Sequence, residues 1–154
     1  MKTNALRLLD AAKIKYEVIE YKVDENDLSA THVAKQLGED ISVVFKTIVL
    51  RGDRQGLFVC IIPGDKEVDL KKAAKASGNK SCAPIKMQEL LPLTGYIRGG
   101  CSPIGIKKPY PMYINNSCME TEKIYVSAGA RGMQIHLSTE DLINYCHLTL
   151  ADLV

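Results

Sequence analysis

One lysine stands out among the residues that could do chemistry. Lys46 lies within Val43–Leu50, a run rich in β-branched residues that predicts a strand with apolar side chains on both faces. An ammonium group in such a strand is unfavourable unless an anion or hydrogen-bond acceptors meet it, and it would suit a phosphate or a developing oxyanion. The pattern leaves one alternative open, a lysine at a sheet edge whose side chain reaches water.

Two glycine-rich segments could surround a ligand. In Gly99–Gly105, consecutive backbone amides could form an anion-binding nest, and Pro103 would stiffen the loop. In Val126–Gly132, two glycines flank Arg131 and could form a hairpin that projects its guanidinium toward a phosphate or a carboxylate. Each segment could equally be an ordinary turn, with Arg131 in solvent.

The residues for covalent or metal chemistry do not form a site. The three histidines lack H-x-x-x-H spacing, no serine has a nucleophile-elbow motif, and paired carboxylates are not evident. The five cysteines include no C-x-x-C pair, so a zinc site, a redox dithiol and any other cofactor are not expected. Only Cys101, between glycine and serine, has a setting that could favour chemistry. A reaction here is therefore expected to rely little on a nucleophile from the enzyme.

Length and composition predict one ordinary globular domain over residues 1–154. Hydrophobic residues make up 46% and charged residues 25% of the 154 residues. The N-terminus begins an amphipathic stretch, and the longest apolar runs are far too short to span a bilayer. We therefore expect a cytoplasmic protein with reduced cysteines and no membrane association.

The charge distribution suggests a local anionic ligand. The net charge is +2 overall, but residues 41–108 carry 12 basic and 5 acidic side chains, whereas the segments on either side are net acidic. A focused basic region can steer an anion even when the whole chain is nearly neutral. One nucleic-acid end fits this pattern better than a long duplex, although several solvated lysine faces would give the same count.

The expected elements alternate irregularly. Helices are predicted after Thr3, Ser29, Asp69 and Ser138 and over 87–91, and strands over 16–21, 43–50, 57–62, 111–114, 123–127 and 133–137. Hairpins and short helices without a regular βαβ repeat indicate an α+β fold around an antiparallel or mixed sheet, with a closed barrel as one possibility.

Four ordered motifs resemble the YbaK/EbsC family, which is related to the editing domain inserted in bacterial prolyl-tRNA synthetases. They are Val44–Thr47, Asp69–Lys72, Gly95–Gly105 and Tyr125–Gly132. The resemblance runs over nearly the whole chain. It implies a mixed, barrel-like sheet flanked by helices, and deacylation of mischarged tRNA. Cys-tRNA(Pro) is the characteristic substrate, with Cys-tRNA(Cys) as an alternative, and prolyl-tRNA synthetase is the candidate partner.

The resemblance also implies roles for individual residues. Lys46 matches the functional lysine and would bind the terminal phosphate or ribose. The amides of Gly99, Gly100, Cys101 and Ser102, in a G-x-x-x-P loop that ends at Pro103, would hold the ester carbonyl. Substrate contacts are expected from Tyr21, Thr47, Ser127, Gly129, Arg131 and Gln134.

Gln134 departs from a branch of the family that carries aspartate at this place, which affects the expected polarity of the pocket. Cys101 stands where the family need not have cysteine, so it is not expected to be a nucleophile. The resemblance implies instead that the thiol of a cysteinyl substrate attacks its own ester and releases a thiolactone, so that the enzyme orients the ester and stabilises charge. A non-catalytic module that binds the tRNA acceptor end or a synthetase is the alternative function.

Overall fold

The computed structural model describes residues 2–154. In chain order, its helices and strands are α1 (Asn4–Ala11), β1 (Tyr16–Glu20), α2 (Ala30–Leu37), η1 (Ile41–Val43), β2 (Phe45–Gly52), β3 (Leu57–Pro63), α3 (Leu70–Ala76), β4 (Cys82–Pro84), α4 (Met87–Thr94), β5 (Met112–Asn115), η2 (Asn116–Glu120), β6 (Lys123–Ala130), β7 (Met133–Ser138), α5 (Thr139–Cys146) and β8 (Thr149–Ala151), where η marks a 3₁₀ helix.

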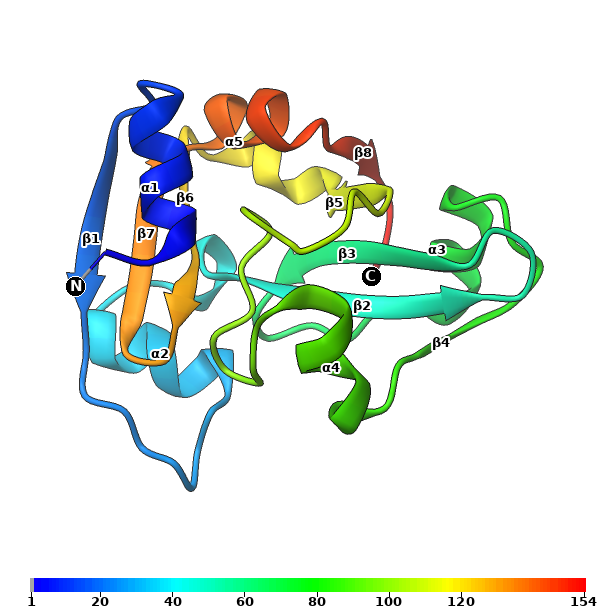
Figure 1. Ribbon diagram of the computed structural model, residues 1–154, viewed down its shortest axis with the longest axis horizontal. Helices are drawn as coiled ribbons and strands as arrows, with labels where there is room; N and C mark the ends of the chain where they lie inside the picture. The colour runs from blue at the N-terminus through cyan, green and yellow to red at the C-terminus, as the bar shows by residue number, and fades with distance from the viewer. Residues whose placement is uncertain (1) are drawn as a thin grey trace.

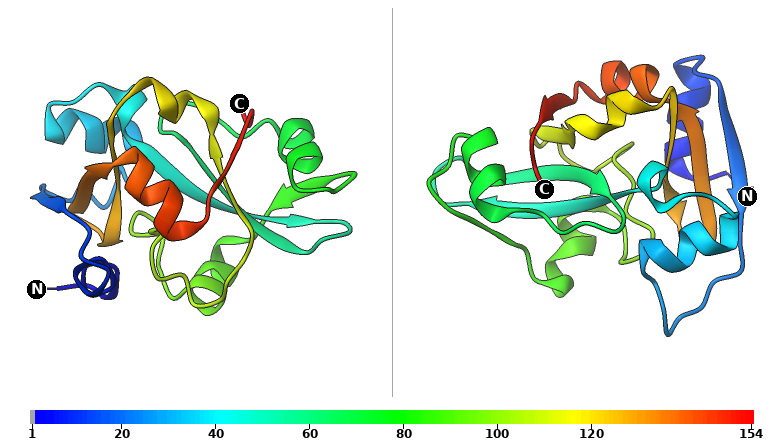
Figure 2. Two further views of the ribbon diagram at one scale, coloured as in Figure 1. Left: turned by 90° about the horizontal axis from the view of Figure 1, so that it is seen from above. Right: turned by 180° about the vertical axis from the view of Figure 1, so that it is seen from behind.

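The strands form two sheets. A three-stranded antiparallel sheet has the order β1-β7-β6, and a five-stranded mixed sheet has the order β4-β2-β3-β5-β8. In the mixed sheet, β4, β2 and β3 are antiparallel neighbours, whereas β5 lies parallel to β3 and β8 parallel to β5. Figure 1 and Figure 2 show the small sheet at one end of the molecule and the long β2–β3 ribbon extending away from it.

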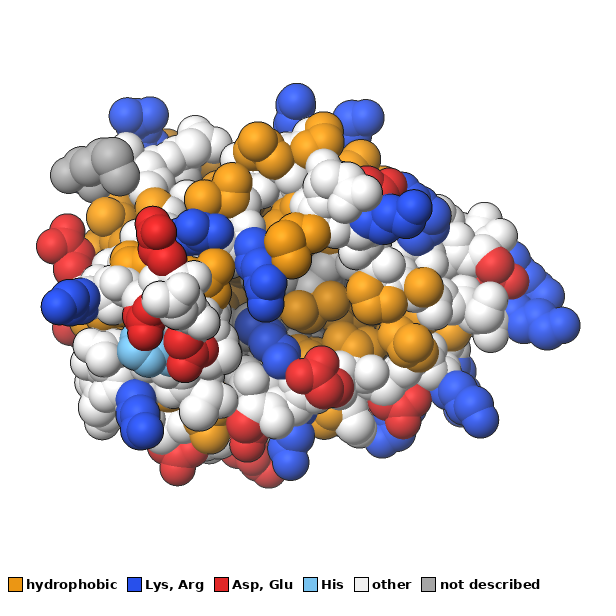
Figure 3. Space-filling model, turned by 90° about the horizontal axis from the view of Figure 1, so that it is seen from below, with side chains coloured by type: hydrophobic (Ala, Val, Ile, Leu, Met, Phe, Trp, Pro, Cys, Tyr) orange, Lys and Arg blue, Asp and Glu red, His pale blue; other side chains and the backbone are white. Residues whose placement is uncertain are grey.

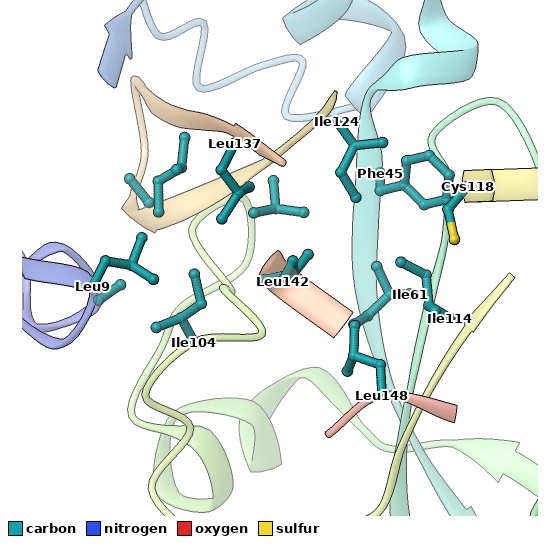
Figure 4. Packing of buried hydrophobic residues seen from close by; sticks show 14 of the residues in the cluster. Leu9, Phe45, Ile61, Ile104, Ile114, Cys118, Ile124, Leu137, Leu142 and Leu148 are labelled. Carbon is teal, nitrogen blue, oxygen red and sulfur yellow. The ribbon is translucent and has the colours of Figure 1, made fainter. Parts of the chain in front are cut away.

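Each face of β2 is covered by a different hydrophobic cluster, as its sequence predicts. Phe45 and Val49 belong to the main cluster, which also draws side chains from α1, α5 and both sheets (Figure 4). Leu50 belongs to a second cluster beneath α3. Burial on both faces explains why most of the strand is apolar.

One edge of β2 is open near its middle. The Gly64 N–H donates to Val44 O at 2.8 Å, so the backbone groups of Val44 point toward the side of β3. Backbone groups alternate in direction along an antiparallel strand, which places those of Thr47 and Val49 on the opposite edge. There Ile85 N–H donates to Val49 O at 3.2 Å, but no described strand runs beside Thr47.

Local sequence signals explain several helix starts. The Thr3 hydroxyl accepts a hydrogen bond from Leu6 N–H, the Asp69 carboxylate accepts two at the start of α3, and the Ser138 hydroxyl accepts one at the start of α5. These side chains satisfy amides that have no partner within their own helix. The three helices therefore begin where their capping residues predict.

The α+β prediction is confirmed, but the strands do not close into one barrel. Among residues 2–154, the pairing of strands between the two sheets is limited to one isolated parallel β-bridge, between Val44 and Tyr125. β2 begins at Phe45 because Ile41–Val43 form a 3₁₀ turn, and the three-residue strands β4 and β8 were not predicted. None of the helices in this part of the chain has the length and apolar character that a membrane crossing requires.

Candidate active site

A cavity of about 640 Å³ lies where the open edge of β2 faces the small sheet. Its walls come from the start of α2, from β2, from the turn after β3, from residues 84–90 and from the loop at 98–101, with one residue each from β6 and β7. Figure 3 shows the face that carries α2 and α4, with Lys and Arg side chains on one side of a hollow and a hydrophobic surface on the other. The cavity thus combines cations with an apolar wall.

Lys46 lies in the wall of this cavity. Its side chain is only 25% exposed, and its Nζ lies 3.6 Å from a carboxylate oxygen of Glu67, whose side chain is 95% exposed. An ion pair with so exposed a partner is weak, so Glu67 can leave when another anion arrives. Arg98 and Lys86 line the same cavity and supply further cations. Together these cations suit a phosphate group.

The loop that follows Arg98 presents backbone amides. Gly99 adopts a φ of +82°, a conformation that other residues adopt only with strain. The Gly100 N–H is already used, because it donates to Ile97 O at 2.9 Å. Within the described chain, the amides of Gly99 and Cys101 have no acceptor, and both residues line the cavity. They are therefore the loop amides that could hold a substrate oxygen.

The turn between β6 and β7 supports this loop from behind. Arg131 Nε donates to Arg98 O at 2.8 Å, and a Cβ on Gly100 would lie 3.2 Å from the backbone of Ala130 and Arg131. Gly129, with a φ of +96°, lies against the ring of Tyr96 so closely that a Cβ would come within 2.9 Å. The turn fixes the position of the loop by direct backbone packing.

Three polar side chains from the sheets complete the wall. Thr47 comes from β2, Ser127 from β6 and Gln134 from β7, where Ser127 and Gln134 are paired neighbours. Ser127 Oγ accepts from Gly129 N–H at 3.2 Å. Thr47 Oγ1 and Gln134 Oε1 are buried without any hydrogen-bond partner among the described residues.

The lining contains no activated nucleophile. Burial raises the pKa of the Cys101 thiol to about 12, which keeps it protonated at neutral pH, and a protonated thiol is a poor nucleophile. No histidine of residues 2–154 lines the cavity, so the hydroxyls there lack an imidazole base. The described part of the chain also has no group of three His, Cys, Asp or Glu side chains that could hold a metal ion.

The structure gathers half of the predicted site residues in this cavity. Those in its lining are Lys46, Thr47, Gly99, Cys101, Ser127 and Gln134. Gly100, Ser102, Pro103, Gly129 and Arg131 lie outside the lining, in or behind the two loops, and Tyr21 packs instead against the cluster beneath α2. The functional roles of all twelve residues stay predictions.

Sequence reasoning missed the wall opposite the sheets. Ile85, Met87 and Leu90 form an apolar side of the cavity, and Met87 is 60% exposed. Glu89 holds this wall in place, because it accepts two hydrogen bonds from Arg51 of β2 and one from the Lys86 N–H. The signal in the sequence that could have revealed this wall was the group of apolar residues on the short predicted helix over 87–91. Arg98 was also missed, although it directly precedes the predicted loop.

Similarity to known proteins agrees with this arrangement. The chain is 45% identical over 152 residues to EbsC of Enterococcus faecalis, which is described by name as a candidate Cys-tRNA(Pro)/Cys-tRNA(Cys) deacylase; the match covers 99% of this chain and 93% of that protein. It is 30% identical over 82 residues to a proline–tRNA ligase of Fervidobacterium nodosum, covering 53% of this chain and 14% of that protein.

The fold also matches a solved structure. A crystal structure described as that of a candidate trans-editing enzyme for prolyl-tRNA synthetase superposes with a TM-score of 0.82 at 22% identity, covering 99% of this chain and 98% of that one. Residues 24–145 match the model of the aminoacyl-tRNA editing domain, a span that includes the whole cavity lining. This protein therefore belongs to the aminoacyl-tRNA editing domain family.

Proposed function

We propose that this protein is a trans-editing deacylase that removes cysteine from mischarged tRNA, with Cys-tRNA(Pro) as the main substrate and Cys-tRNA(Cys) as a further one. The observation that carries the proposal is a cavity lined by three basic residues, Lys46, Lys86 and Arg98, and by open loop amides, but without an activated nucleophile. Such a site can orient an ester and stabilise charge, while a thiol of the substrate supplies the attack. The name of EbsC supports this choice of substrate.

In this proposal, each wall of the cavity binds one part of the substrate. Lys46 and Arg98 bind the phosphate or ribose at the 3′ end of the tRNA, at the cationic side of the cavity. The amides of Gly99 and Cys101 hold the ester carbonyl, where negative charge grows as the bond forms. The apolar wall around Ile85 and Leu90 covers the terminal nucleoside.

The reaction is a cyclisation followed by hydrolysis. The sulfur of the cysteinyl group attacks its own ester carbonyl, a carbon–sulfur bond forms, and the bond to the ribose oxygen breaks. The thiol proton ends on that ribose oxygen, which leaves a tRNA with a free 3′-terminal hydroxyl and a β-thiolactone. Water then opens the thiolactone to cysteine. The enzyme needs only to hold the ester in a reactive conformation and to stabilise the oxyanion.

A deacylation assay on mischarged tRNAs tests the proposal. We expect deacylation of cysteinyl-tRNA to be at least about 100-fold faster than deacylation of seryl-tRNA, because a hydroxyl is a much weaker nucleophile than a thiol at neutral pH. Direct detection of the thiolactone by mass spectrometry at early reaction times would identify the cyclisation. Equal release of serine would exclude attack by the substrate thiol, and the absence of all turnover would leave a module that binds the tRNA end.

The role of Lys46 has a matched control. Lys46→Met should lower kcat/KM by roughly 100-fold or more through loss of charge stabilisation, with the fold retained. Lys66, an exposed lysine outside the cavity lining, should tolerate the change to Met with little effect. Unchanged turnover by a folded Lys46→Met protein would remove Lys46 from the mechanism. Adding prolyl-tRNA synthetase to the assay tests whether this partner sharpens the choice of tRNA.

A further inference from the structure

Two buried oxygens in the cavity wall lack the partners that such atoms normally have. Gln134 is only 5% exposed, and its Oε1 has no hydrogen-bond partner among the described residues. Thr47 Oγ1 is in the same condition, and both residues line the cavity. Buried polar groups in folded proteins are nearly always hydrogen-bonded, and an exception needs an explanation. A ligand group that donates hydrogen bonds would provide one.

A third acceptor lies beside them on the open edge of β2. Thr47 pairs with Ile61 of β3, but the alternation set by the bond between Gly64 N–H and Val44 O turns the backbone of Thr47 away from β3. No described strand covers this edge at Thr47, and the residue lines the cavity. The Thr47 carbonyl is therefore available to the same ligand.

The chemistry of these groups selects their ligand. All three acceptors are neutral oxygens, and the two carboxylates of the lining, Asp65 and Glu67, are exposed at its rim. An aminoacyl ester has one group near the scissile bond with several N–H donors, the α-amino group. We infer that Gln134 and Thr47 bind the α-amino group of the substrate, an inference that rests on the proposed deacylase function.

This assignment has a consequence for substrate choice. A hydrogen-bonding site for a free amine rejects esters in which that amine is missing, because its buried acceptors then stay unpaired. An N-acylated amine has fewer donors and more bulk, so peptidyl-tRNA would also be rejected. The site would thus accept aminoacyl-tRNA, whose α-amino group is free, and exclude peptidyl-tRNA.

A pair of substrates isolates the amine. Cysteinyl-tRNA and 3-mercaptopropionyl-tRNA carry the same thiol and the same ester, but the second lacks the α-amino group. Because the α-amino group also activates the ester and the thiol, kcat/KM is divided by the uncatalysed deacylation rate of the same tRNA. We expect this corrected value to be roughly 10- to 100-fold higher on cysteinyl-tRNA for the wild type, as hydrogen bonds to a charged group predict. Gln134→Met and Thr47→Val, which nearly keep side-chain size, should each lower kcat/KM on cysteinyl-tRNA roughly 10-fold more than on 3-mercaptopropionyl-tRNA and so remove most of this preference.

Controls separate recognition from folding and from failure of the reaction. Gln36→Met, an exposed change on α2, should leave the preference intact, and thermal melts should show that each variant is folded. Binding of stable 3′-amide analogues of cysteinyl- and 3-mercaptopropionyl-adenosine gives a readout without turnover. If wild-type protein binds the two analogues equally, or if the variants lose activity equally on both tRNAs, the amine assignment is wrong. Amine-dependent binding without turnover would instead contradict only the deacylase function.

Discussion

The loop at 99–105 and the turn at 129–132 are both glycine-rich, yet only the first contributes to the cavity wall. Gly99 and Cys101 line the cavity, whereas Gly129 and Arg131 lie behind the loop and contact Tyr96 and the Arg98 carbonyl. Glycine allows close backbone approach in both places. In the first loop the approach is available to a ligand, and in the second it is filled by the protein itself. The same composition therefore serves recognition in one segment and support in the other.

The largest effect is expected in the supporting turn. Gly129→Ala would force a φ of +96° on alanine and place its Cβ 2.9 Å from the buried Tyr96 ring. The free energy of unfolding should fall by about 3 kcal/mol, measured by urea denaturation, while kcat/KM per folded molecule stays within about 3-fold. Gly56→Ala, with a φ of +76° but open space around its Cβ, is the matched control and should cost about 1 kcal/mol. Equal losses would show that packing on Tyr96 is unimportant.

In the lining loop, activity should suffer more than stability. Gly99→Ala strains a φ of +82°, but its Cβ would meet Arg131 Nε and a Leu28 methyl only at 3.4 Å. We expect the free energy of unfolding to fall by about 1–2 kcal/mol. Turnover should fall by about 10-fold, because a shifted loop misplaces the amides of the cavity. Full activity on cysteinyl-tRNA would contradict a role of this loop in the site.

Arg131 distinguishes support from direct binding. Loss of its hydrogen bond to Arg98 O should cost about 1 kcal/mol in unfolding free energy and lower kcat/KM by about 3-fold. Arg131→Lys keeps the charge but loses the planar Nε–H donor. It should therefore resemble Arg131→Met in both measurements. If Lys preserves activity and only Met loses it, Arg131 binds the substrate through its charge.

The smallest effect is expected for the cysteine of the lining loop. Cys101→Ala should keep kcat/KM within about 3-fold, because a thiol with a pKa of about 12 is not a nucleophile at neutral pH. The burial that raises this pKa above the ordinary value of 9.0 also links stability to pH. The contribution of the protonated Cys101 thiol to the free energy of unfolding is complete below pH 9 and is lost as the pH rises toward 12. Between pH 8 and pH 10.5, urea titrations should therefore show a smaller decrease in the free energy of unfolding for Cys101→Ala than for the wild type.

Local patterns identified much of the site but not its boundary. The strand around Lys46 and the glycine loop at 99–105 were both predicted, because apolar runs and glycine clusters reflect the backbone of their own segment. The exclusion of Gly100 and Ser102 from the lining could not be predicted, since it depends on which amides meet Ile97 and the β6–β7 turn. The wall formed by α4 was missed for the same reason. Its position depends on the contact of Glu89 with Arg51, 38 residues earlier in the chain.

The sequence by itself determined the helix starts at Thr3, Asp69 and Ser138 and the two-sided burial of β2. Each depends on neighbours within a few residues, where hydrogen bonding and alternation follow from residue type. Only the tertiary structure decided that Thr47 and Gln134 share a cavity and that one glycine loop supports the other. Those facts depend on how two separate sheets meet, and packing between distant segments leaves little trace in the local order of residues.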